Sequence, residues 1–212
     1  MLEGIRILII GASHLATPGY LITGLHDQLQ AKGAQVHSIG VCGVTPSAWV
    51  SETQGLCGSA ERKGKSPPRL SILRAAHTTP VRTLIAQDQP QWVIVVMGDT
   101  LAGYKEGNFS RQWAWTEVQQ LTSQLEQSQT RCIWVGPPWG NDGGALQKSN
   151  QRVKQVSDFL AEHVAPCRYI NSLTMSRPGQ WATADGQHFY DDGYRAWSTA
   201  ITREVLQIVN SR

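Results

Sequence analysis

Charged side chains are scarce in this sequence. They make up 17% of its 212 residues, whereas about a quarter is usual for a soluble domain, and hydrophobic residues make up 41%. This balance excludes a disordered chain, because disorder requires high charge and little apolar content. The formal net charge is only +3, so we expect no nucleic-acid partner, which would need a strongly basic surface.

Long apolar runs are absent as well. No span approaches the roughly 18 uninterrupted apolar residues of a transmembrane helix, so we expect no membrane span. The first residues, Met1-Leu2-Glu3-Gly4, lack the charged and long apolar regions of a signal peptide. We therefore expect either a cytoplasmic protein or a periplasmic or secreted one whose leader is not part of this sequence.

The four cysteines contain no C-x-x-C pair, which argues against a zinc site, and we expect no metal. Their even number allows two disulfides, and four buried thiols are an equal alternative. Cys132 and Cys167 both lie at the beginnings of predicted neighbouring strands. Cys42 and Cys57 flank one predicted loop. If disulfides form, these are the expected pairs.

Five short apolar runs alternate with helical patterns along the chain. The runs show little polar alternation, as expected for parallel strands buried on both faces, and they cover residues 5–10, 35–41, 92–97, 131–135 and 168–170. Helices are predicted over residues 19–32, 80–89, 110–129, 147–163 and 190–209. This alternation predicts a single α/β domain over residues 1–212 with a doubly wound sheet. The basic segment 51–69 is predicted to be a solvated surface loop.

Ligands of such sheets bind at the carboxyl ends of the strands. Ser13 follows the first predicted strand and opens a helix, where backbone N–H groups favour an oxyanion, although a helix cap is the simpler role for a lone serine. Asp185 and His188 precede the last helix. Their spacing lets the carboxylate hold one imidazole nitrogen while the other takes a proton from a serine hydroxyl. No phosphate-binding glycine motif follows the first strand.

Four short blocks occur in the order found in one hydrolase family. They are Gly11-Ala12-Ser13-His14, Gly40-Val41-Cys42-Gly43, Gly98-Asp99-Thr100 and Asp185-Gly186-Gln187-His188. Through them the sequence resembles the SGNH hydrolases, also called GDSL-type esterases and lipases. The resemblance implies a flavodoxin-like, three-layer α/β/α sandwich with a five-stranded parallel sheet. It also implies that no organic cofactor is required.

The resemblance implies a role for each matched residue. Ser13 would be the nucleophile, His188 the base and Asp185 the residue that orients His188. The oxyanion hole would consist of the N–H groups of Ser13 and Gly43 with Thr100, which stands where the family has Asn. A threonine replaces a planar amide donor with a shorter hydroxyl. A register shifted by one residue would instead place Asp99 there, and its carboxylate would repel the oxyanion.

Tryptophan is unusually frequent, with eight residues against three Phe. Flat side chains in loops at the expected active-site end would stack on sugar rings or line an acyl pocket, or else anchor the loops; they are Trp49, Tyr104, Trp139 and Trp181. His14, beside the nucleophile, is expected to touch the substrate. Four tryptophans in predicted helices or strands are assigned to the core: Trp113, Trp115, Trp134 and Trp197.

Together these features predict a serine esterase that hydrolyses an ester, most simply an O-acetyl group on a saccharide. The same site would also serve an O-acetyltransferase that works with partners in polysaccharide modification. A non-catalytic carbohydrate-binding or assembly protein with a decayed site is a further alternative. Thr100 favours the last reading, whereas the intact set Ser13, Asp185 and His188 favours an enzyme.

Overall fold

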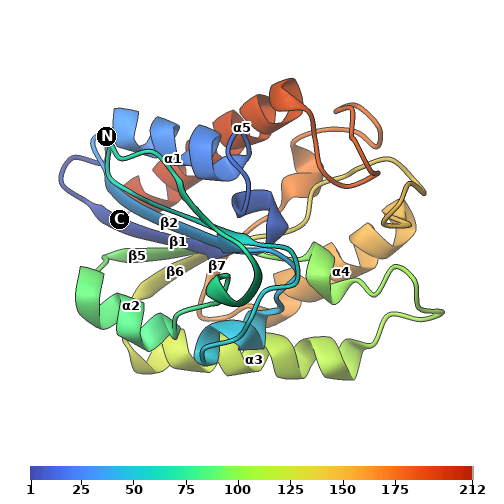
Figure 1. Ribbon diagram of the computed structural model, residues 1–212, viewed down its shortest axis with the longest axis horizontal. Coiled ribbons are helices and arrows are strands. Elements are labelled where there is room, and N and C mark those ends of the chain that lie inside the picture. Colours follow the sequence, from blue (N-terminus) through green and yellow to red (C-terminus); the bar gives the residue numbers. More distant parts are fainter. Residues whose placement is uncertain (212) are drawn as a thin grey trace.

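The computed structural model describes residues 1–211 and shows a seven-stranded sheet between two layers of helices (Figure 1). The strand order is β4-β3-β2-β1-β5-β6-β7. The five strands predicted from the apolar runs are all present and parallel: β1 (Arg6–Gly11), β2 (Gln35–Val41), β5 (Trp92–Val96), β6 (Arg131–Val135) and β7 (Arg168–Ile170). The expected α/β sandwich is therefore confirmed.

All five predicted helices are also present. Two of them, α1 (Leu21–Ala31) and α5 (Asp191–Asn210), cover one face of the sheet. The other face is covered by α2 (Val81–Asp88), α3 (Arg111–Gln127) and α4 (Asn150–His163). None of the helices in the described part of the chain combines the length and hydropathy needed to cross a membrane. Short 3-10 helices lie in the loops: η1 (Ser13–Leu15), η2 (Pro46–Val50), η3 (Leu73–Ala75), η4 (Asp99–Leu101) and η5 (Ser172–Thr174).

The central strands are apolar on both faces because both faces are covered. In β1, Ile7 and Ile9 belong to the core under α1 and α5, whereas Leu8 and Ile10 belong to the core under α2, α3 and α4. Successive side chains of a strand point to opposite faces, so one short run supplies both cores. The carboxyl ends of these strands therefore form a well-packed platform for the loops that follow them.

The sequence predicted a surface loop over residues 51–69, but part of this segment forms a strand. It contains β3 (Ser59–Lys63) and leads into β4 (Arg69–Ser71), which extend the sheet beyond β2 in antiparallel fashion. Ala60 is buried opposite Gly40, while Glu61 and Arg69 form an exposed ion pair across the two strands. Of the charges that suggested a loop, Arg62 and Lys63 lie on β3, and Arg69 lies on the edge strand β4, where a charge discourages pairing with other chains.

Both expected disulfides are present, Cys42–Cys57 and Cys132–Cys167. They close loops of sequence separation 15 and 35, so each is expected to stabilise the fold by about 3–4 kcal/mol through loop entropy.

We expect the denatured, unreduced protein to gain no mass from a thiol alkylating agent and to gain four labels after reduction. Intact mass spectrometry makes the measurement. Four labels without reductant would contradict both bridges.

Candidate active site

The structure brings Ser13, His188 and Asp185 together in one hydrogen-bonded chain. His188 Nε2 lies 2.7 Å from Ser13 Oγ, and His188 Nδ1 lies 2.7 Å from Asp185 Oδ2. Ser13 and His188 are 175 positions apart in the sequence, so it is the tertiary fold that brings them into contact. The Ser13 hydroxyl is thus engaged with the imidazole, as a serine nucleophile would be before it loses its proton.

The loop that carries Asp185 and His188 is held by its own hydrogen bonds. Asp185 Oδ1 accepts from the backbone N–H groups of His188, at 2.7 Å, and Gln187, at 2.9 Å. Gly186 has φ +95°, and a Cβ there would meet Gly143 O at 2.5 Å, so this turn requires glycine. One carboxylate therefore fixes both the turn and the imidazole.

The hydrogen bonds to Asp185 also keep it ionised. Burial alone would raise the pKa of this carboxyl, but the donors on His188 and Gln187 outweigh burial and lower the pKa. An ionised Asp185 accepts a hydrogen bond from His188 Nδ1–H, which leaves Nε2 as the unprotonated nitrogen that faces Ser13. This is the tautomer that a general base for the serine requires.

The short helix η1 places Ser13 at the edge of the sheet. It packs directly over β2, and a Cβ on Gly40 would lie 2.2 Å from the backbone of Leu15. The second of the four sequence blocks thus begins with glycine because η1 leaves no room for a side chain. Ser13 opens this single 3-10 turn, and α1 begins later, at Leu21.

Three donors expected to form an oxyanion hole are unused. Within residues 1–211, the backbone N–H groups of Ser13 and Gly43 have no hydrogen-bond acceptor. Thr100 Oγ1, which is shielded from solvent, has no partner in the same part of the chain. Gly43 has φ +80°, and a Cβ there would collide with Leu56 at 2.7 Å. Within residues 1–211, therefore, no protein acceptor competes for these three groups.

His14 and Tyr104, which were expected to contact substrate, instead belong to a buried polar network. His14 Nε2 lies 2.9 Å from Asp99 Oδ2, and Tyr104 donates its hydroxyl to Asp99 Oδ1. Lys148 Nζ donates to the same Oδ1 at 2.9 Å. The side chain of Asp99 is therefore turned into this network. Lys148 was missed in the sequence, since a single lysine in a loop carries no recognisable signal.

The aromatic residues divide between the core and the surface differently from the prediction. Trp49, expected to bind substrate, has no exposed surface and packs in the core with α3. Trp139 and Trp181 are half-buried; the Trp139 indole donates to Leu173 O, and Trp181 meets Phe189 edge-on. Trp134 and Trp197 are buried as expected, but Trp113 and Trp115 are 41% and 46% exposed on α3.

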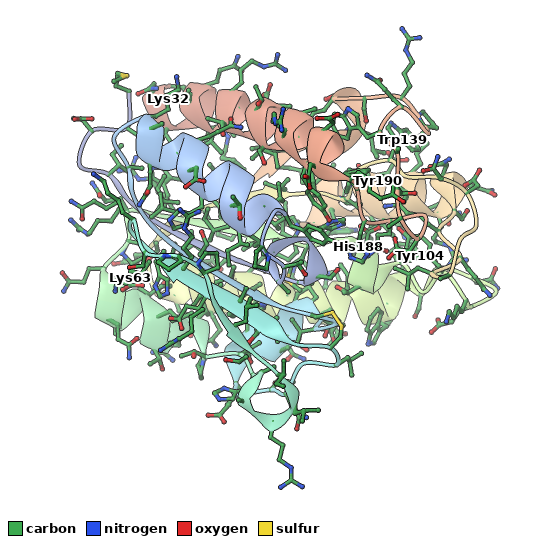
Figure 2. All side chains as sticks on the ribbon, turned by 45° about the horizontal axis from the view of Figure 1, so that its top comes forward. Lys32, Lys63, Tyr104, Trp139, His188 and Tyr190 are labelled. Atoms are coloured by element: carbon green, nitrogen blue, oxygen red, sulfur yellow. A yellow bond between two sulfur atoms is a disulfide. The ribbon has the colours of Figure 1, made fainter. Side chains whose placement is uncertain are left out.

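One end of the molecule gathers most of these residues. His188, Tyr104, Trp139 and Tyr190 lie together at this end, whereas Lys32 and Lys63 lie at the opposite end (Figure 2). Tyr190 is 60% exposed there, and Tyr20 stacks on the imidazole of His188 with ring centres 5.7 Å apart. Within residues 1–211, no group of three or more His, Cys, Asp or Glu is arranged to hold a metal ion.

Comparison with known proteins places the chain in a family. No protein-family model matches it. Protein BcsX of Komagataeibacter xylinus is 36% identical over 207 residues, which span 97% of this chain and 78% of BcsX. The chain belongs to the BcsX family.

Two solved structures show which fold this BcsX-family chain has. A GDSL-like lipase from Bacteroides thetaiotaomicron superposes with a TM-score of 0.60 at 13% identity, covering 96% of this chain and 88% of the lipase. An acetyl xylan esterase, AlAXEase, superposes with a TM-score of 0.59 at 13% identity, covering 95% of this chain and all of the esterase (100%). Identities this low establish the fold alone. The chain has the SGNH hydrolase fold, as the four sequence blocks indicated.

Proposed function

We propose that this protein is a serine esterase that removes an O-acetyl group from a saccharide, and that residues 1–212 act as one catalytic domain. The observation that carries the proposal is the continuous chain from Ser13 Oγ through His188 to Asp185, with both contacts at 2.7 Å. The acetyl ester as substrate is supported by the fold shared with an acetyl xylan esterase.

The proposed reaction has two steps. Ser13 Oγ attacks the ester carbonyl while His188 Nε2 takes its proton, and the carbonyl oxygen becomes an oxyanion held by the N–H groups of Ser13 and Gly43. Collapse of the intermediate expels the sugar alkoxide, which receives the proton from His188. Water, activated by the same imidazole, then releases acetate from Ser13. Asp185 stabilises the imidazolium in both steps.

Trp139 and Trp181 are proposed to bind the saccharide, since both are half-buried in loops that follow or flank the carboxyl ends of the strands. If a sugar hydroxyl replaces water at the acetyl-enzyme, the same site transfers the acetyl group instead. The two disulfides support a periplasmic or extracellular location, because such bonds persist in oxidising compartments.

A direct test uses p-nitrophenyl acetate and O-acetylated oligosaccharides. We expect release of acetate from both, with a transient gain of one acetyl group on Ser13 in the intact mass. Acetyl transfer to an added sugar without net acetate release would identify a transferase. Sugar binding with no cleavage of any ester would overturn the enzymatic proposal.

Thr100 is proposed to be the third oxyanion donor, because its buried hydroxyl has no partner within residues 1–211. Thr100→Val keeps the shape of the side chain and removes the donor, so we expect kcat on p-nitrophenyl acetate to fall by up to about 10²–10³-fold. Thr100→Asn supplies an amide donor with longer reach and is expected to raise kcat. A Thr100→Val enzyme with wild-type kcat would remove Thr100 from the oxyanion hole.

A further inference from the structure

A second histidine lies directly behind the proposed catalytic one. The ring of His14 is centred 5.1 Å from that of His188 and is buried. His14 also hydrogen-bonds to a carboxylate, Asp99, so the structure holds two His–Asp pairs side by side. For His188 to work as the base, the proton of the reaction must reside on His188 and not on His14.

The second pair differs from the first by a buried ammonium. The side chain of Lys148 is completely buried and that of Asp99 is 5% exposed, and Lys148 Nζ lies 2.9 Å from Asp99 Oδ1. An unpaired charge at such a site would be very costly, so each of the two ions depends on the other. The lysine stem packs where Gly140 leaves space, since a Cβ on Gly140 would lie 2.8 Å from it.

The hydrogen bonds fix the proton positions in this network. An ionised Asp99 only accepts, so His14 donates through Nε2–H, and Tyr104 and Lys148 donate to Oδ1. His14 Nδ1 lies 2.8 Å from the hydroxyl of Tyr194, and a neutral ring accepts from that hydroxyl. Burial raises the pKa of Tyr194 well above its usual range, so it remains a donor.

One carboxylate here faces two possible cations, Lys148 and His14. Lysine is the stronger base by about four pKa units, so the ammonium carries the charge. Burial would raise the pKa of Asp99, but Lys148 and His14 together hold it far below its usual range. Burial lowers the pKa of His14 to about 4; Asp99 opposes this effect, and the charges of His188 and Lys148 add to the lowering.

We propose that Lys148 is a positioning residue whose ammonium neutralises Asp99 and so keeps His14 uncharged, which leaves His188 as the only imidazole of the adjacent pair that takes up the proton of the reaction. This inference rests on the proposed esterase function for its consequence in catalysis. Its electrostatic part concerns the resting protein alone and is testable without any substrate.

The chain contains a matched control at the other end of the sheet. There Lys63 Nζ and His37 Nδ1 both lie 2.5 Å from the carboxylate of Asp88. This is the same combination of lysine, aspartate and histidine, but Lys63 is 69% exposed and lies at the opposite end of the molecule from His188 (Figure 2). Lys63→Met therefore removes an equivalent charge without touching the proposed network.

The first experiment follows the imidazole ¹⁵N signals of His14 and His188 against pH by NMR. Removal of Lys148 in Lys148→Met leaves Asp99 unmatched, so we expect His14 to become protonated at a pH at least one unit higher than in the wild type. The groups facing His14 in this comparison are Asp99, His188 and Tyr194, with Lys148 behind Asp99. Lys63→Met should leave the His14 titration unchanged. An unchanged titration in Lys148→Met would overturn the proposal.

The second experiment measures hydrolysis of p-nitrophenyl acetate. We expect Lys148→Met to lower kcat at least tenfold with little change in KM and to move the acidic limb of the profile to higher pH. Adding Asp99→Asn removes the unmatched charge and should restore the position of that limb. A double variant that keeps the displaced limb would contradict the charge mechanism. If the wild type cleaves no ester, the esterase proposal fails and the NMR titration still decides the role of Lys148.

Folding is a third readout of the same idea. If the Lys148→Met protein folds only when Asp99→Asn is added, the proposal is supported, because the unmatched carboxylate is then the cause of the folding defect. A double variant that also fails to fold would overturn it, since Lys148 would then be needed for its packing and not for its charge.

Discussion

Ser13→Ala is expected to reduce the cleavage of p-nitrophenyl acetate by about 10⁴-fold or more, while circular dichroism and thermal unfolding remain those of the wild type. The reason is that only the Ser13 oxygen lies within 2.7 Å of His188 Nε2 among residues 1–211. Loss of that oxygen leaves the imidazole with no nucleophile to activate. The substitution removes only one hydroxyl on a short 3-10 turn, so both hydrophobic cores remain intact.

Ser110→Ala is the matched control for this variant. Ser110 is exposed at the start of α3, and its side chain does not cap that helix. We expect wild-type kcat from this control. If Ser13→Ala kept more than a tenth of the wild-type rate, Ser13 would not be the nucleophile.

His188→Ala is expected to cost nearly as much, because it removes the only base in contact with the Ser13 hydroxyl in the described residues. In the wild type, kcat/KM should fall as the pH is lowered, since a protonated imidazole cannot accept the serine proton. The lowered pKa of Asp185 keeps this carboxylate ionised over the same range, so Asp185 does not cause that fall. The measurement is a pH profile of kcat/KM for both proteins.

His77→Ala provides the comparison for the second variant. His77 is 41% exposed at its side chain and lies outside the chain of contacts that joins Ser13 to Asp185. We expect it to keep the wild-type pH profile. A His188→Ala protein with the wild-type profile and rate would mean that another group acts as the base.

The parallel part of the sheet was predictable because its signal is local. A strand covered on both faces must be apolar at nearly every position. Residues 92–96 and 131–135 were therefore predicted as strands without knowledge of the segments that pack against them. The strands β3 and β4, which end the sheet on one side, were not predictable in the same way. They are less buried than the central strands and carry charges, which also occur in surface loops.

The tryptophans show the limit of assigning burial from position. Trp49 lies in a polar-looking loop but η2 folds back over the sheet and buries it against α3. Trp113 and Trp115 lie in a helix with a clear apolar face, yet both lie outside that face. A helix or loop assignment does not say which side of the element faces the protein, because that depends on contacts with distant segments.

The sequence by itself determined the fold class and indicated Ser13, Asp185 and His188 as candidate site residues, because each of these follows from local pattern or from a short motif. Only the tertiary structure decided that the side chain of Asp99 forms a buried pair with Lys148, and that His14 is hydrogen-bonded to the same carboxylate. Lys148 and Asp99 are 49 residues apart, and no local pattern records a contact between two loops. Burial made the difference, since the same lysine and aspartate on the surface would be a weak ion pair, whereas in the interior each requires the other.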